Sequence, residues 1–137
     1  MATSAAPVER QLTGTPWAVR LGRAATECPA LEVYDAETLV DVVVRTSVAP
    51  EILRGARRGV SHGRPCAVAW GRLPADAPLP VVLFTGGRWA GRTHRAEVTA
   101  IGGFCWLAVA YGRFTSVAVE HRGTLCGRLR IRTGHRS

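Results

Sequence analysis

Turn residues divide the second half of this chain into short apolar runs, and this spacing is the strongest constraint on its fold. The runs are separated by the dipeptides Gly112-Arg113 and Arg122-Gly123, and they cover residues 104–111, 114–121 and 124–132. Two-residue connections of this kind are typical of tight β-hairpins. The sequence therefore predicts a C-terminal three-stranded antiparallel meander.

The two connections also predict a register, with Tyr111 opposite Phe114 and His121 opposite Thr124, so that side chains alternate between two faces. One face is core-like and carries Cys105, Leu107, Val109, Tyr111, Phe114, Ala118, Leu125, Leu129 and Ile131. The other face puts aromatic and basic side chains together and carries Phe104, Trp106, Val117, Val119, His121, Cys126, Arg128, Arg130 and Arg132.

The rest of the chain is also rich in apolar runs bounded by turn residues. Further strands are predicted at 17–23, 30–34, 65–72, 80–85 and, more weakly, 95–101. One short helix is expected near 49–58, because Pro50 suits a first helical position and Gly59 a C-terminal stop. We therefore expect an α+β fold, mainly antiparallel β, with a curved sheet or partly open barrel. Residues 1–15 are expected to form a flexible N-terminal arm and 16–137 a single compact domain.

Neither a membrane-spanning segment nor an export signal is recognisable. The longest apolar run, 104–111, is far shorter than the roughly 20 residues that a spanning helix needs, and residues 1–10 lack an apolar core. The cysteines are far apart and form no C-x-x-C pair: Cys28, Cys66, Cys105 and Cys126. These features predict a cytoplasmic protein with free thiols, no metal site and no cofactor.

Positive charge is concentrated in the second part of the chain. All 18 basic residues are arginines, which indicates a GC-rich coding sequence and accounts for part of the net charge of +8. Residues 1–50 carry four arginines and six acids, whereas residues 51–137 carry fourteen arginines and four acids. A surface polarised in this way attracts nucleic acid, phosphate-bearing ligands or acidic proteins.

The arginine-rich segments predict a contact surface for an anionic partner. Arginine binds phosphate in bidentate geometry, and an indole ring offers a stacking plane for a base. The predicted contact residues are Arg54, Arg57, Arg58, Arg64, Arg88, Arg92, Trp106, Arg128, Arg130 and Arg132. We therefore expect a non-enzymatic binding or regulatory protein whose partner is nucleic acid, and a homodimer built on the strand at 124–132. The alternative is that Trp106 packs in the core and the arginines only border it.

A segment with two stretches of helical spacing precedes the strand-rich half. Pro50 opens the second stretch, and the apolar positions are Leu39, Val42, Val48, Leu53 and Ala56. Residues 38–59 resemble the helix-turn-helix of lac-repressor-type regulators, although Val43 and Ser47 depart from that pattern. The resemblance implies that DNA would be approached by Pro50, Glu51, Arg54 and Arg58. Because residues 38–45 are rich in valine, a strand followed by a helix is the alternative.

A glycine-rich segment, 86–93, has the glycine spacing of a phosphate-binding P-loop. Arg92 stands where that motif requires lysine, and the bulky Trp89 fills the loop. We therefore predict a turn between two strands, whose backbone amides could hold an anion together with Arg88 and Arg92.

Two other classes of function stay open. A small-molecule pocket inside the β-structure, for ligand binding or catalysis, would be lined by Trp70, Phe84 and Tyr111. An interaction module for an acidic protein would use the same arginines. Catalysis has little support, because the chain contains no G-x-S-x-G motif and the neighbours His62 and Cys66 are separated by Arg64-Pro65.

Overall fold

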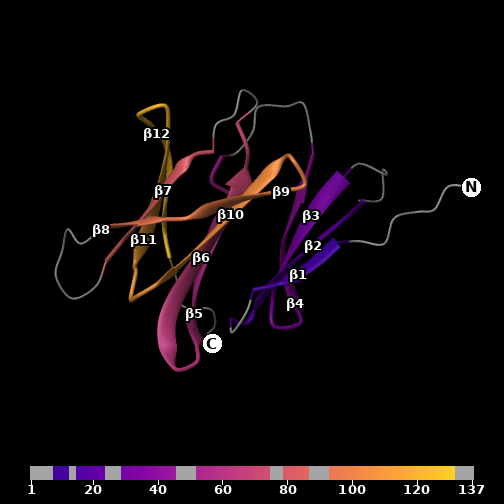
Figure 1. Ribbon diagram of the computed structural model, residues 1–137, viewed down its shortest axis with the longest axis horizontal. Coiled ribbons are helices and arrows are strands. Elements are labelled where there is room, and N and C mark those ends of the chain that lie inside the picture. Colours follow the sequence, from indigo (N-terminus) through magenta and orange to yellow (C-terminus); the bar gives the residue numbers. More distant parts are fainter. Residues whose placement is uncertain are drawn as a thin grey trace, which may run out of the picture.

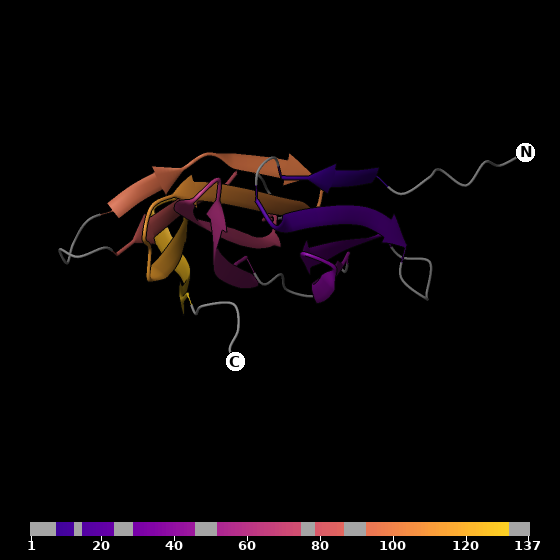
Figure 2. The same ribbon diagram turned by 90° about the horizontal axis from the view of Figure 1, so that it is seen from below.

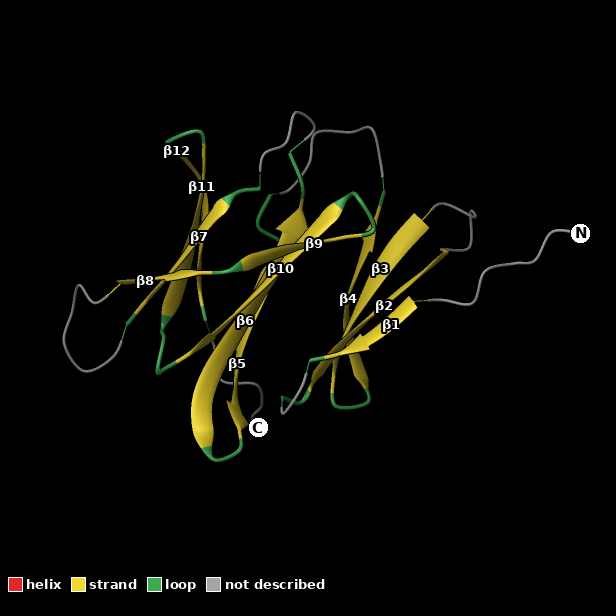
Figure 3. Ribbon diagram, in the orientation of Figure 1, coloured by secondary structure: helices red, strands yellow, loops and turns green. Residues whose placement is uncertain are grey.

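The computed structural model describes residues 8–12, 15–23, 29–45, 52–74, 79–86 and 93–131, and in these ranges the chain is all-β (Figures 1 and 3). The N-terminal sheet has the order β1-β2-β3-β4, with bounds Val8–Gln11, Trp17–Arg23, Pro29–Asp35 and Thr38–Val44. The central sheet has the order β5-β6-β10-β9, with bounds Gly55–Ser61, Arg64–Arg72, Cys105–Tyr111 and Val98–Ile101. The C-terminal sheet has the order β12-β11-β7-β8, with bounds Thr124–Arg130, Ser116–His121, Val81–Thr85 and Thr93–Ala96.

The central sheet lies between the other two and is covered on both faces (Figure 1). Along β6, Cys66, Val68 and Trp70 pack with the N-terminal sheet, whereas Ala67 and Ala69 pack with the C-terminal sheet. Strand β10 alternates in the same way. Strands buried on both faces are continuous apolar runs instead of apolar-polar alternations, which explains the composition of these two segments.

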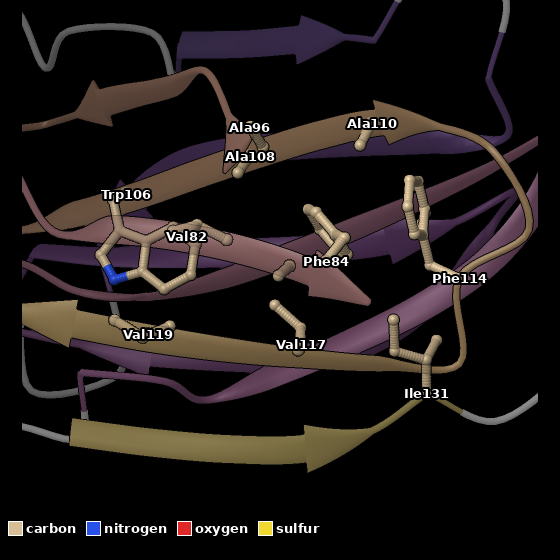
Figure 4. Packing of buried hydrophobic residues seen from close by; sticks show 12 residues of the cluster. Val82, Phe84, Ala96, Trp106, Ala108, Ala110, Phe114, Val117, Val119 and Ile131 are labelled. Carbon is tan, nitrogen blue, oxygen red and sulfur yellow. The ribbon is translucent and has the colours of Figure 1, made fainter. Parts of the chain in front are cut away.

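The core between the central and C-terminal sheets is built around large rings set against small residues. The ring centroids of Phe84 and Phe114 are 5.4 Å apart, and Trp106 is fully buried in the same cluster. Figure 4 shows these rings together with the alanines of β10 and the valines of β11. Small side chains on the central sheet therefore leave room for aromatic rings in this layer.

One extended segment joins the central and C-terminal sheets. Strand β8 pairs with β7 of the C-terminal sheet, and after Glu97 the chain continues as β9, which pairs with β10 of the central sheet. Figure 2 shows β8 and β9 following one another along the same side of the molecule. At the opposite edges of these two sheets, β5 and β12 do not pair with each other, so no closed barrel forms among the described strands.

The predicted helix at 49–58, and with it the α+β class, is wrong for the described residues. Residues 46–51 lie outside them, and Gly55–Ser61 is strand β5, paired antiparallel with β6. The ring of Trp70 lies against Gly55 and that of Trp17 against Gly59, so close that a Cβ on either glycine would collide with them. Pairing with β6 and this ring packing outweigh the local helical pattern.

The helix-turn-helix interpretation is also wrong, because its first element is strand β4, Thr38–Val44. This strand was the alternative that the valine-rich sequence favoured. The strands predicted at 17–23, 30–34, 65–72 and 80–85 are confirmed, and the weaker run at 95–101 contributes to β8 and β9. Of the expected N-terminal arm, residues 8–11 form β1 and pair with β2, while residues 1–7 lie outside the described residues.

Of the two hairpins in the predicted three-stranded meander, one is confirmed and one is wrong. Strands β11 and β12 form the expected hairpin with His121 opposite Thr124. Strand β10, however, pairs with β6 and β9, and Tyr111 lies opposite Cys66 instead of Phe114. The Gly112-Arg113 connection carries the chain from the central sheet to the C-terminal sheet.

The predicted faces of these strands therefore change. Val117 and Val119, expected on the mixed face, are fully buried. Tyr111 and Leu125, expected in the core, are 46% and 51% exposed. A bulge between Val119 and Glu120 shifts the register of the β11–β12 hairpin by one residue, which places Leu125 on the opposite face of the sheet from Leu129.

The described residues contain no helix that is long and apolar enough to cross a membrane.

Candidate anion-binding face

The C-terminal sheet has one face in the core and one face open to solvent. Alternate residues along its four strands point inward, among them the buried Val82, Phe84, Val117 and Val119. The other residues form what we call the outer face: Leu125, Arg128 and Arg130 of β12, Ser116, Ala118 and Glu120 of β11, Val81, Leu83 and Thr85 of β7, and Thr93 and Arg95 of β8.

The strand register aligns this outer face in rows that cross the sheet. One row runs from Arg128 through Ala118 and Leu83 to Arg95. With neighbouring strands about 4.8 Å apart, the backbones of its two arginines are separated by about 14 Å. Arginines therefore stand at both edges of the sheet, with small or aliphatic side chains between them.

The next row is rich in hydroxyl groups. It runs from Arg130 through Ser116 and Thr85 to Thr93, and the Oγ1 atoms of the two threonines are 3.4 Å apart. Arg128 and Arg130 follow each other at two-residue spacing, about 6.8 Å along the strand. Hydroxyl and guanidinium donors thus share one face of the sheet.

The exposed charges on this face are mostly positive. Arg95, Arg128 and Arg130 are exposed, and none of them forms an ion pair with another described residue. Two acids lie near one end of this face: Glu120 is opposite Val81, and the exposed Glu97 follows Arg95 at two-residue spacing. The face therefore combines three guanidinium groups that form no ion pair with a described residue and two carboxylates at one end.

Two of the arginines predicted for anion binding form ion pairs within the protein. Arg54 forms a bidentate ion pair with Asp41 of β4, with Nη2 2.6 Å from Oδ1 and Nε 3.2 Å from Oδ2. Arg57 forms an ion pair with Asp35, with Nε 3.0 Å from Oδ2. Both pairs connect the central sheet to the N-terminal sheet, so these charges are already compensated.

The remaining predicted contact residues are dispersed. Trp106 is fully buried, and its indole Nε1 donates a hydrogen bond of 2.6 Å to the Ile52 carbonyl oxygen. Arg58 is half-buried on β5, and the guanidinium of Arg64 lies 5.1 Å from the centre of the Tyr111 ring. Outside the described residues lie Arg88, Arg92 and Arg132.

Among the described residues of the predicted set, the structure brings Arg128 and Arg130 together on one open face, and it adds Arg95. Sequence reasoning missed Arg95 because the run at 95–101 is weak and its partner strand was unknown. Arg95 lies in a stretch of alternating polar and apolar residues that follows the Gly-rich segment, and this alternation could have identified it as a strand residue.

The residues predicted for a small-molecule pocket do not meet. Trp70 lies in the core between the N-terminal and central sheets, and Phe84 in the core between the central and C-terminal sheets. Tyr111 is 46% exposed at the end of β10. A groove is found elsewhere, with a volume of about 410 Å³, at the corner where β8 continues into β9. It is lined by Leu79, Pro80, Val81, Arg95, Ala96, Glu97 and Val98.

Cys66 and Cys105 are buried free thiols. Burial raises the pKa of Cys66, and it raises the pKa of Cys105 to about 12 against a smaller opposing effect of the Arg72 charge. Both are therefore protonated at neutral pH, and only the thiolate is a nucleophile and metal ligand. In the part of the chain that the structure describes, no group of three His, Cys, Asp or Glu side chains is placed to hold a metal ion.

No family model, curated protein or solved structure matches this chain. A function for this protein is therefore inferred from the geometry and charge of the outer face.

Proposed function

We propose that this protein binds nucleic acid through the outer face of the C-terminal sheet and acts as a non-enzymatic binding or regulatory protein. The observation that carries the proposal is the placement of Arg95, Arg128 and Arg130 on one open sheet face without ion-pair partners among the described residues.

The chemistry of this face suits a phosphate backbone. Guanidinium groups bind phosphate in bidentate, charge-assisted geometry, and hydroxyl groups such as those of Ser116, Thr85 and Thr93 also donate to phosphate oxygens. Residues 121–137, which include Arg128 and Arg130, contain five arginines and no acidic side chain, so the side-chain charge of this part of the sequence is entirely positive. Contacts of this kind set affinity and register without reading the sequence of the bases.

Charge reversal on β12 tests the proposal. We expect the double variant Arg128→Glu and Arg130→Glu to bind a labelled oligonucleotide on the order of 100-fold more weakly than the natural protein at about 0.1 M salt. The slope of log affinity against log salt should become shallower by about 1.5, because two phosphate contacts are lost. Fluorescence anisotropy at several salt concentrations measures both quantities.

A matched control separates this face from net charge. The double variant Arg45→Glu and Arg64→Glu changes the charge by the same amount at two exposed positions outside the outer face. It should keep most of the affinity. Equal losses in the two double variants would mean that the arginines act only through total charge, and the proposal would then fail.

A further inference from the structure

The groove at the β8–β9 corner opens beside the outer face. Arg95 belongs to both, since it ends the row of the outer face and lines the groove with Val81. We propose that this groove holds one unpaired nucleobase of a single-stranded nucleic acid whose phosphate lies on Arg95. This inference rests on the proposed function and adds to it the class of nucleic acid.

The lining of the groove fits a base better than it fits a phosphate. Leu79, Pro80, Val81 and Val98 provide aliphatic surface, and Leu79 is 43% exposed although it is a large apolar residue. A volume of about 410 Å³ lies in the range of small-ligand sites and accommodates a single base. Bases in a duplex are stacked and paired, so only an unpaired base can enter a lateral groove of this kind.

One carboxylate gives the groove a hydrogen-bonding preference. Glu97 lines the groove, is exposed, and forms no ion pair with a described residue. An ionised carboxylate only accepts hydrogen bonds, and it can accept two from neighbouring donors. Guanine presents adjacent N–H donors on its pairing edge, whereas thymine presents one. We therefore infer that the groove favours guanine.

The position of the groove continues the phosphate path across the sheet. From Arg95 the row of the outer face leads to Arg128, about 14 Å away across three strand spacings. A short single strand with one base in the groove would thus keep its following phosphates within reach of the β12 arginines.

Three oligonucleotides of about eight nucleotides test this inference. All are strands of abasic nucleotides with the same number of phosphates, and the central position alone carries guanine, thymine or no base. We expect the natural protein to bind the guanine strand about tenfold more tightly than the abasic strand, with the thymine strand between them. The Glu97→Gln variant should lose most of the preference for guanine over thymine while it still binds both strands.

Glu37→Gln is the matched control, because Glu37 is an exposed acid in the turn between β3 and β4. It removes the same charge and should leave the base preference unchanged. Equal affinity of the natural protein for the three strands, with salt-dependent binding intact, would overturn the base site and leave the proposed function standing. Equal effects of the two Glu→Gln variants would also overturn it. Failure to bind any strand would overturn the proposed function and this inference with it.

Discussion

A Gly71→Ala variant is expected to lose about 4 kcal/mol of folding free energy, although it adds only one methyl group. A Cβ atom at Gly71 would collide with the carbonyl group of Ile52 and lie 2.9 Å from Nε1 of Trp106. The same carbonyl accepts the indole hydrogen bond of Trp106. To make room, the 52–54 segment has to move away from β6, which breaks that bond in a buried layer.

The neighbouring contacts prevent an easy adjustment. The Arg54 N–H donates to the Trp70 carbonyl oxygen at 2.9 Å, so the segment is fixed at its other end as well. Urea unfolding followed by tryptophan fluorescence measures the loss. Gly63→Ala is the comparison. A Cβ atom at position 63 would meet no atom within 4 Å, so only the φ of 78° is unfavourable for alanine. This conformation costs about 1 kcal/mol of folding free energy. Equal losses in the two variants would show that the Ile52 contact is unimportant.

Periodicity and turn residues predicted most strands of this fold, because both are local properties of the sequence. The hairpin at Arg122-Gly123 is an example: the two residues adopt φ values of 55° and 80°, which suit a two-residue turn with both central residues at positive φ. The Gly112-Arg113 pair has similar composition, yet it connects two sheets. A turn dipeptide indicates that the chain changes direction. The strand with which the next segment pairs depends on contacts between residues that are distant in sequence.

The three-layer arrangement explains why the faces of β10 were misassigned. A strand in the middle of the central sheet is buried on both sides, so alternation between Trp106 and Leu107 says nothing about which side faces solvent. The usable signal was the set of small residues in β6 and β10, at Ala67, Ala69, Ala108 and Ala110. Four alanines facing one layer indicate a second layer of large rings.

The candidate site was predictable in part for a similar reason. Arg128 and Arg130 lie on an edge strand, and both are exposed there as their alternating pattern predicts. Arg54 and Arg57 belong to an equally basic segment, but the acids that pair with them lie in β3 and β4. The sequence shows the charges, and the topology decides which of them are compensated.

An Asp41→Ala variant is expected to lose on the order of 3 kcal/mol of folding free energy at neutral pH. The Asp41 carboxylate accepts hydrogen bonds from Arg54 and from the Trp70 indole, whose Nε1 lies 2.7 Å from Oδ2. It joins β4 of the N-terminal sheet to the 52–54 segment and to β6. Removing it leaves a half-buried guanidinium and a buried indole N–H without this acceptor. Asp35→Ala, which removes the hydrogen bond from Arg57 Nε, should cost about 1 kcal/mol.

The same carboxylate makes stability depend on pH. Burial raises the pKa of Asp41, but the hydrogen bonds from Arg54 and Trp70 and the charge of Arg54 together lower it below its usual value. A pKa that is lower in the folded state stabilises the protein above the unfolded-state pKa of about 3.9, and this contribution is lost as the pH falls through the folded-state pKa. Urea unfolding at neutral pH and at about pH 3 should therefore show the difference between the natural protein and Asp41→Ala shrinking in acid. A difference that stays constant across this range would mean that the ionised carboxylate does not hold the two sheets together.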